Sequence, residues 1–291
     1  MRVLHLDGGR EMRGGQWQVL RLIEGLMAAG VESTLLARRD GSLFEAARER
    51  SWDVRPLGLV RTLLERGCDI VHAHDARGHT IAAVAGAQPL IVSRRVAFHV
   101  RSAWKYARPQ RYIAVSRFVK SVLMCGGVPA AKISVVPDGV PLLEEARGDA
   151  VLAPANADPL KGTALAREAA RLAGVELQLS HDPERDFEGA AMYLYLTHSE
   201  GLGSGALLAM SAALPVVASN TGGLPEIVEH RQTGLLVENE VGSIAAAIRE
   251  LRADPGFARR LGAEGRRRVR ENFTVDHMVR RTMEVYRQVL S

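Results

Sequence analysis

Residues 198–237 read HSEGLGSGALLAMSAALPVVASNTGGLPEIVEHRQTGLLV and carry the most regular pattern of the chain. The apolar run MYLYL precedes them. Within them a helical pattern from Ser204 is followed by the β-like run PVVAS, a second helical pattern from Leu224 and the run GLLV. Short apolar runs that alternate with helical patterns are typical of parallel strands joined by helices. This segment therefore predicts an α/β fold.

The same alternation extends outward over the rest of the sequence. The first half contains the strand-like runs RVLHL, STLLA, DIVHA, PLIVS and YIAVS, with helical patterns between them. Residues 135–149, VVPDGVPLLEEARGD, combine prolines, glycines and clustered acids, which makes them the best linker candidate. The alternation then restarts with AVLA and VELQL. We therefore expect two α/β units, each with a mainly parallel sheet.

A glycine-rich loop follows the first strand-like run. The stretch DGGREMRGGQWQVL, residues 7–20, places four glycines within nine positions. Glycine costs conformational entropy and is tolerated where φ is positive or where another molecule approaches the backbone closely. After the loop, a helical pattern from Gln16 places four apolar residues on one side, Trp17, Leu20, Ile23 and Met27, and ends at Gly30, a suitable C′ glycine.

Composition limits the classes of partner. The 291 residues suit two domains, and the formal charge of +5 comes mainly from arginine. This balance favours anionic partners such as phosphates or an acidic lipid surface. Nucleic acid is not an expected partner, because the arginines are dispersed and no aromatic stacking array is present.

The cysteines and the apolar runs bear on the compartment. Cys68 and Cys125 lie far apart without metal-type spacing, which favours core packing in a reducing compartment. The first residues do not resemble a signal peptide, and no apolar run reaches membrane-spanning length. We expect a cytoplasmic protein, with peripheral contact at the inner membrane face left open.

The motifs fall where ligands bind in open α/β sheets, beyond the carboxyl ends of the strands. The glycine loop follows RVLHL, and His74 closes the strand DIVHA. Glu200 and the Thr221-Gly222-Gly223 turn follow the later strands MYLYL and PVVA. All of these residues are therefore expected at a binding edge.

Residues 198–237 closely resemble the signature region of the retaining GT-B glycosyltransferases of family 4, the group 1 glycosyltransferases. The family pattern is Ser-x-x-Glu-Gly-Phe-Gly, then Pro-Val-Val-Ala, Gly-Gly-x-Pro-Glu-Ile-Val and Gly-Leu-Leu-Val. The segments GREMRGGQWQVLRLIEGL, DIVHAHDA, ISVVPDGV and LKGTALAREAARL are similar to other family motifs. The resemblance thus spans nearly the whole chain.

The resemblance implies two facing Rossmann-like domains with mainly parallel sheets. Residues 1–140 would form the acceptor-side domain and residues 141–272 the donor-side domain, with a helix in residues 273–291 crossing back to the first. It implies retaining transfer of a hexosyl-type sugar from a nucleotide-sugar donor to a glycan or lipid-linked acceptor, without metal or other cofactor and without a placed protein nucleophile. The alternative is a non-catalytic or weakly active relative that binds sugar or nucleotide as an accessory subunit.

Three residues carry the expected chemistry. By resemblance, Glu200 accepts hydrogen bonds from donor-sugar hydroxyls, and His74 contacts the donor sugar. Lys161 would supply positive charge to the diphosphate, where charge grows as the nucleotide departs. The competing interpretations are a helix cap for Glu200, a structural histidine and a solvated surface lysine.

The remaining donor-binding candidates are small residues. Gly203, Ser204 and Gly205 open a helix and could place bare N–H groups against the diphosphate, with Ser204 as cap or donor. An ordinary Ser-capped buried helix is the alternative. A side chain at Gly14 or Gly15 would block a ligand from the backbone, and the alternative there is a tight strand-to-helix turn.

The sequence departs from the family pattern in three places. The second glutamate of the family, eight positions after Glu200, is Leu208, so the acceptor for the ribose hydroxyls is missing from the donor-binding set. The arginine five positions before Lys161 is Asn156. Only 39 positions separate Lys161 from Glu200, which suggests the loss of a strand-helix piece.

Residues 94–111, RRVAFHVRSAWKYARPQR, mix cations with aromatic side chains. They could hold an anionic acceptor or touch anionic lipid. A solvated basic loop and helix is the competing interpretation.

Overall fold

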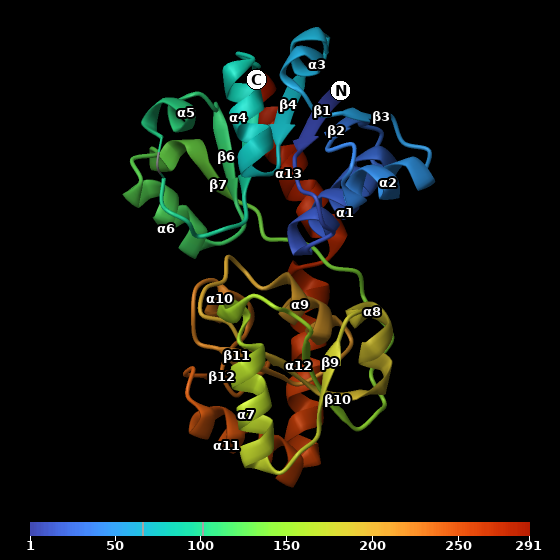
Figure 1. Ribbon diagram of the computed structural model, residues 1–291, viewed down its shortest axis with the longest axis vertical. Coiled ribbons are helices and arrows are strands. Elements are labelled where there is room, and N and C mark those ends of the chain that lie inside the picture. Colours follow the sequence, from blue (N-terminus) through green and yellow to red (C-terminus); the bar gives the residue numbers. More distant parts are fainter. Residues whose placement is uncertain (66, 101) are drawn as a thin grey trace. The chain divides into compact units, whose positions relative to one another are not determined.

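The computed structural model describes residues 1–65, 67–100 and 102–291 (Figure 1). Its contacts divide the chain into two compact units. Unit 1 comprises Met1–Gly139 with Val275–Ser291, and unit 2 comprises Val140–Thr274. Each unit contains one sheet whose strand pairs are parallel, which confirms the α/β class.

Unit 1 has a seven-stranded sheet in the order β3-β2-β1-β4-β5-β6-β7. Its strands are β1 (Arg2–Asp7), β2 (Glu32–Ala37), β3 (Val54–Pro56), β4 (Ile70–Ala73), β5 (Leu90–Arg94), β6 (Arg111–Ala114) and β7 (Ile133–Val135). Its helices are α1 (Gly14–Ala28), α2 (Ser42–Glu49), α3 (Leu59–Leu64), α4 (Ala76–Val84), α5 (Ala103–Ala107), α6 (Arg117–Cys125), the 3₁₀ turn η1 (Ala130–Lys132) and α13 (Val275–Leu290).

Unit 2 has a five-stranded sheet in the order β12-β11-β10-β8-β9. Its strands are β8 (Ala150–Pro154), β9 (Leu177–Ser180), β10 (Ala190–Tyr195), β11 (Val216–Ser219) and β12 (Leu235–Val237). Its helices are α7 (Thr163–Ala173), α8 (Pro183–Asp186), α9 (Ser204–Ser211), α10 (Leu224–Ile227), α11 (Val241–Ala253) and α12 (Pro255–Asn272), with the 3₁₀ turns η2 (Pro159–Lys161) and η3 (Phe187–Gly189).

The central strands are buried along their length, as expected where helices cover both faces of a parallel sheet. Every residue of β4 and β5 is buried in unit 1, and every residue of β11 in unit 2. No helix among the described residues is both long and apolar enough to span a bilayer.

Helix α13 packs on α1 within unit 1 (Figure 1). Its residues Val279 and Tyr286 belong to the same buried cluster as Leu22 and Leu26 of α1. A Cβ at Gly25 would lie 2.5 Å from Val279 Cγ2, so the small residue in α1 permits this close approach. The last helix of the chain is therefore part of the core of the first unit.

Helix α1 begins two residues earlier than its pattern indicated and ends as expected. Gly30 adopts φ +81° just after the helix, the left-handed conformation that suits a C′ glycine. Leu20 is buried, whereas Trp17 and Met27 are 42% and 39% exposed, so the predicted apolar side was wrong for these two residues. The buried face instead includes Val19, Leu22 and Leu26.

Each sheet has a point where the chain reverses its order of strand addition. In unit 1 this point lies between β1 and β4, and in unit 2 between β8 and β10. The loops that leave such neighbouring strands diverge to opposite faces of the sheet and leave a crevice at the carboxyl edge. The loops after these four strands are therefore the ones expected to contact ligands.

Tyr286 tests the packing of α13 on unit 1. Its hydroxyl lies 2.7 Å from His72 Nδ1, and both groups are fully buried. Tyr286→Phe leaves the imidazole nitrogen without this partner, so we expect the free energy of unfolding to fall by about 1–3 kcal/mol. Urea unfolding measures the change, and Ser121→Ala removes a matched exposed hydroxyl. Equal stability of Tyr286→Phe and wild type would contradict a stabilising hydrogen bond between Tyr286 and His72.

Candidate functional site

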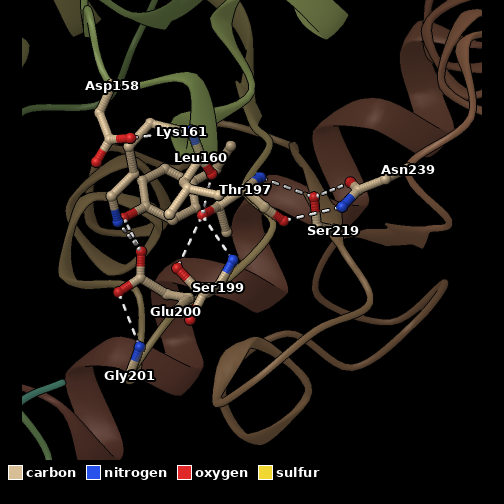
Figure 2. Close-up of polar contacts among 10 residues, drawn as sticks. Asp158, Leu160, Lys161, Thr197, Ser199, Glu200, Gly201, Ser219 and Asn239 are labelled. Carbon is tan, nitrogen blue, oxygen red and sulfur yellow. Dashed lines mark hydrogen bonds and ion pairs between the residues drawn. The ribbon is translucent and has the colours of Figure 1, made fainter. Parts of the chain in front are cut away.

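Lys161 and Glu200 meet at the carboxyl edge of the unit 2 sheet. Lys161 ends η2 in the loop after β8, and Glu200 lies in the loop after β10, the neighbouring strand. Lys161 Nζ donates to Glu200 Oε2 at 3.0 Å (Figure 2). The strand order thus brings together two predicted site residues that are 39 positions apart in the sequence.

The Glu200 carboxylate has two further hydrogen bonds. The Tyr195 hydroxyl donates to Oε2 at 2.9 Å, and the Gly201 N–H donates to Oε1 at 3.0 Å. The Glu200 side chain is 13% exposed and that of Lys161 is 33% exposed. Glu200 bonds the adjacent backbone rather than an N–H of α9, so the contacts do not support its interpretation as a helix cap.

A hydrogen-bond network fixes the loops that carry this ion pair. The Leu160 carbonyl accepts from the His198 N–H at 2.8 Å and from the Thr197 hydroxyl at 3.0 Å. The Thr197 N–H donates to Ser219 Oγ at 2.9 Å, and Asn239 Nδ2 donates to the Thr197 carbonyl at 3.0 Å. Figure 2 shows the contacts of Thr197 with Leu160, Ser219 and Asn239 beside Lys161 and Glu200. The ends of β8, β10 and β11 are thereby joined.

The local structure of unit 2 requires glycine at two positions in the loops of the ion pair, 162 and 203. Gly162 adopts φ +65°, and a Cβ there would lie 2.6 Å from the Leu196 carbonyl oxygen. Gly203 adopts φ +105°, and a Cβ there would lie 2.5 Å from Leu224 Cδ2. Both positions require glycine for the backbone turn and for close packing.

Helix α9 begins at Ser204 and has Gly203 as its N-cap, with no hydrogen bond from a capping side chain. Of the two roles expected for Ser204, the helix cap is wrong because the residue already lies in the first turn, and the role of hydrogen-bond donor to the diphosphate stays a prediction. Gly205 follows it, and a Cβ there would lie 2.8 Å from Tyr195 Cε2. The first N–H groups of a helix have no intrahelical acceptor, so this end is suited to bind an anion.

Two of the three departures from the family pattern, Asn156 and Leu208, are single residues that the structure describes. Asn156 Oδ1 accepts the Asp158 N–H at 2.9 Å, and the Asn156 carbonyl accepts from the Thr163 hydroxyl at 3.0 Å. These bonds order the loop before Lys161. Leu208 is 6% exposed within α9, and its place beside a ribose stays a prediction.

His74 closes β4 at the edge of the unit 1 sheet, and it is buried against two further histidines. Its Nε2 lies 2.9 Å from His5 Nδ1, and its ring centroid lies 4.0 Å from that of His72. His5 and His72 are register partners on the neighbouring strands β1 and β4. His72, as expected, lies within the sheet, where it bonds Tyr286 and Ser93.

Burial keeps these three rings neutral. It lowers the pKa of His5 to about 3. Burial also lowers the pKa of His72 and of His74 well below the ordinary value, and the neighbouring rings and Arg95 act in the same direction. A neutral His74 can accept or donate a hydrogen bond but adds no positive charge to the edge.

One nitrogen from each of the three rings lies within 4.8 Å of the other two, a spacing at which a metal could be held. Both nitrogens of His72 are occupied by Tyr286 and Ser93, and His5 bonds His74 directly. In these contacts His5 and His74 are hydrogen-bond partners of each other, and His72 is a hydrogen-bond partner of Tyr286 and Ser93.

The four glycines of the loop after β1 fall into two pairs. A Cβ at Gly8 would lie 2.7 Å from the Arg77 side chain, and one at Gly9 would lie 2.4 Å from Gln16 Nε2. Gly14 and Gly15 instead begin α1. The nearest described atom to a Cβ at Gly15 is Arg95 Cδ at 3.9 Å, so packing among the described residues does not require glycine there.

Two polar residues near these loops, Asp75 and Arg13, have structural partners. Asp75 caps α4 by accepting the Gly78 N–H at 2.7 Å. Arg13 lies on the surface and pairs with Glu11 at 2.7 Å. Both contacts agree with a structural interpretation of these residues.

Sequence reasoning did not identify His5, Asp7 or Arg95. Asp7 ends β1, is buried, and accepts from the Gly9 N–H at 2.8 Å. Burial and the charge of Asp75 raise the pKa of Asp7. Arg95 pairs with Asp138 at 3.2 Å, and both side chains are largely buried. The signal available beforehand was polar residues at the ends of apolar strands.

Two conserved-domain descriptions match the chain. Glycosyltransferase Family 4 matches residues 12–143, and Glycosyl transferases group 1 matches residues 154–268. Together they cover most of the sequence, and the fold agrees with both. The chain belongs to the group 1 glycosyltransferases and has the GT-B fold.

Relatives of several activities match parts of the chain. Alpha-maltose-1-phosphate synthase of Mycolicibacterium smegmatis is 36% identical over 121 residues, which is 39% of this chain and 31% of that protein. The GDP-mannose-dependent alpha-(1-6)-phosphatidylinositol monomannoside mannosyltransferase of Mycobacterium tuberculosis is 47% identical over 68 residues, 23% of this chain and 18% of that protein. The matches therefore span less than a third of these relatives' own length.

Among solved structures, Alr3699/HepE of Anabaena in complex with UDP and glucose aligns with a TM-score of 0.86. The identity is 15%, and the alignment covers 99% of this chain and 100% of that chain. At this identity the similarity shows the fold.

The buried histidines predict that stability depends on pH. In the unfolded chain each imidazole binds a proton below about pH 6.5, whereas the folded rings stay neutral. The unfolded state then holds more protons. For His5 the free energy of unfolding therefore falls as the pH falls from about 6.5 towards about 3, by up to about 1.4 kcal/mol per pH unit, and His72 and His74 act in the same direction.

Urea unfolding at a series of pH values measures this dependence. His5→Gln removes one buried ring and should reduce the slope, whereas His181→Gln removes an exposed ring as the matched control. A slope that His5→Gln leaves unchanged would refute the neutral state of His5.

Proposed function

We propose that the chain transfers a hexosyl-type sugar, with retention, from a nucleotide-sugar donor to a glycan or lipid-linked acceptor. The observation that carries the proposal is the Lys161–Glu200 ion pair at the carboxyl edge of unit 2, on loops from the neighbouring strands β8 and β10. Family membership supplies the reaction class. The relatives' names, which include a GDP-mannose-dependent enzyme, support a nucleotide-sugar donor.

The charges at this edge suit departure of a nucleoside diphosphate. Lys161 is the mobile cation, and the first N–H groups of α9 add fixed partial positive charge beside the same loop. Both would stabilise negative charge that grows on the leaving phosphate. Glu200 is held by Tyr195 and Gly201 as well as by Lys161, so it can keep its position when the lysine turns to the donor.

The same arrangement gives Glu200 a second task. A carboxylate accepts hydrogen bonds from sugar hydroxyls and favours positive charge at the anomeric carbon. His74 and the backbone at Gly14 and Gly15 belong to unit 1, where we propose that they contact the donor sugar and a ligand that approaches the start of α1. No residue is assigned as a nucleophile, and no metal is assigned to the reaction.

Lys161→Ala tests the diphosphate role. We expect the affinity for a nucleoside diphosphate to fall by about tenfold or more, because a hydrogen bond to a charged group is lost. Calorimetry with UDP and with GDP measures the change, and Arg171→Ala on the exposed side of α7 is the matched control. Unchanged affinity in a folded Lys161→Ala protein would refute this role. A wild-type protein that binds no nucleotide would favour the accessory role instead.

Gly15→Val tests the loop of unit 1. Because the described neighbours leave room for a side chain, the variant should unfold at nearly the wild-type urea concentration while binding its nucleotide-sugar donor or acceptor more weakly. Gly8→Val is the contrasting variant, since Arg77 occupies the space beside Gly8 and stability should fall. Full binding by Gly15→Val would leave only a turn role for this glycine.

We also propose that residues 94–111 contact an anionic membrane; residue 101 lies outside the described residues. Arg94 and Lys105 donate to carbonyls of unit 1, so part of the positive charge is used internally. Arg108 is exposed and lies over the Trp104 ring, and Phe98 and Trp104 are 65% and 50% exposed, so positive charge and apolar surface are both available. An apolar tip of this kind can insert at a lipid surface.

Sedimentation with vesicles containing phosphatidylserine tests this contact. We expect binding at low salt that weakens at high salt, and a clear loss in the Phe98→Ser, Trp104→Ser double variant. The matched control is Leu172→Ser, which changes an exposed apolar residue of unit 2. Absence of binding at low salt would reject the membrane contact.

A further inference from the structure

A small basic pocket lies at the carboxyl edge of the unit 1 sheet, apart from the residues discussed above. Its volume is about 220 Å³, and its lining consists of Arg38, Arg39, Asp40, Pro56, Leu57 and Arg77. The residues Arg38, Arg39 and Asp40 follow β2, Pro56 and Leu57 lie at the end of β3, and Arg77 lies in the first turn of α4, which follows β4. The pocket therefore opens where an α/β sheet binds ligands.

The charges in this pocket are unequal. Three arginines face one carboxylate, and Arg38 occupies both oxygens of Asp40, with Nε 2.6 Å from Oδ1 and Nη2 3.0 Å from Oδ2. Arg10 also approaches Asp40, at 3.8 Å. Across residues 1–65, 67–100 and 102–291, the structure gives Arg39 and Arg77 no hydrogen bond or ion pair. Two guanidinium groups are thus available to an anion.

The position of Arg77 strengthens the argument. It lies in the first turn of α4, where the helix dipole disfavours a cation and where the Asp75 carboxylate, bound to the Gly78 N–H, supplies the negative charge of the cap. Its side chain packs on Gly8, since a Cβ at Gly8 would lie 2.7 Å from Arg77 Cβ and Cδ. Gly8 thereby leaves room for the arginine stem beside the loop. A bound anion would give the Arg77 guanidinium the polar partner that it lacks among the described residues.

We propose that this pocket binds a phosphoryl group of the acceptor, so that the acceptor is a phosphate ester. That the bound group belongs to the acceptor rests on the proposed function. That an anion binds in this pocket rests on the arginines alone. A planar guanidinium binds phosphate through two parallel hydrogen bonds, which an isolated lysine does not do. A volume of about 220 Å³ suits one such group better than a whole ligand.

The first experiment measures the anion site without a nucleotide. Inorganic phosphate is titrated by calorimetry into Lys161→Ala, which lacks the lysine that we propose binds the diphosphate. Adding Arg77→Gln or Arg39→Gln should weaken phosphate binding by about tenfold, whereas Arg48→Gln, an exposed arginine of the same unit, should leave it unchanged. Affinity that neither Arg77→Gln nor Arg39→Gln alters would overturn the proposal.

The second experiment identifies the source of the phosphate. Soluble glycerol phosphate and phosphatidylcholine vesicles with phosphatidic acid each compete with inorganic phosphate for the Lys161→Ala protein. Displacement by glycerol phosphate supports a soluble phosphate ester, and displacement only by the vesicles supports a lipid phosphate. Displacement by neither would contradict the inference.

The third experiment separates this inference from the proposed function. Nucleotide release from a nucleotide sugar is compared for glucose and a glucose phosphate as acceptors, in wild type and in Arg77→Gln. We expect the phosphate ester to be preferred and the preference to be lost in Arg77→Gln, with UDP or GDP affinity unchanged. Nucleotide binding without any preference that depends on Arg77 would refute the inference, whereas phosphate binding that depends on Arg77 without nucleotide binding would refute the proposed function.

Discussion

The ion pair between Lys161 and Glu200 is the interaction on which the donor-side account depends. It joins the loops after two neighbouring parallel strands, at the point where the strand order of unit 2 reverses. Tyr195 and Gly201 hold the carboxylate independently of the lysine. The lysine can therefore exchange its partner for a phosphate while the carboxylate keeps its place for the sugar.

The equivalent edge of unit 1 is arranged differently. Its strand ends carry neutral, buried histidines, and the Tyr286 hydroxyl of α13 completes the bonds of His72. Hydrogen bonding, without added charge, is what such rings can offer a ligand. Positive charge at this edge comes instead from arginines, among them Arg77, whose side chain packs on Gly8 of the glycine-rich loop. The two glycine pairs of that loop thus serve different purposes.

The sequence predicted the α/β class and the family, because apolar runs and their punctuation report local structure directly. It also placed Glu200 at the carboxyl edge of its sheet, and the structure brings Lys161 to the same edge because parallel strands bring their carboxyl ends together. It did not predict that Ser204 would follow the cap, or that His5 would lie beside His74. Both depend on backbone conformation and strand register, which the sequence pattern does not encode.

The central claim is that Lys161 binds the diphosphate and Glu200 binds the sugar. Calorimetry of Glu200→Gln with a nucleoside diphosphate and with the matching nucleotide sugar tests it most directly. The isosteric amide releases Lys161, so the account predicts that the diphosphate binds as tightly as to wild type or more tightly, while the nucleotide sugar loses affinity relative to it. Equal losses for both ligands, or no loss for the nucleotide sugar, would contradict the account.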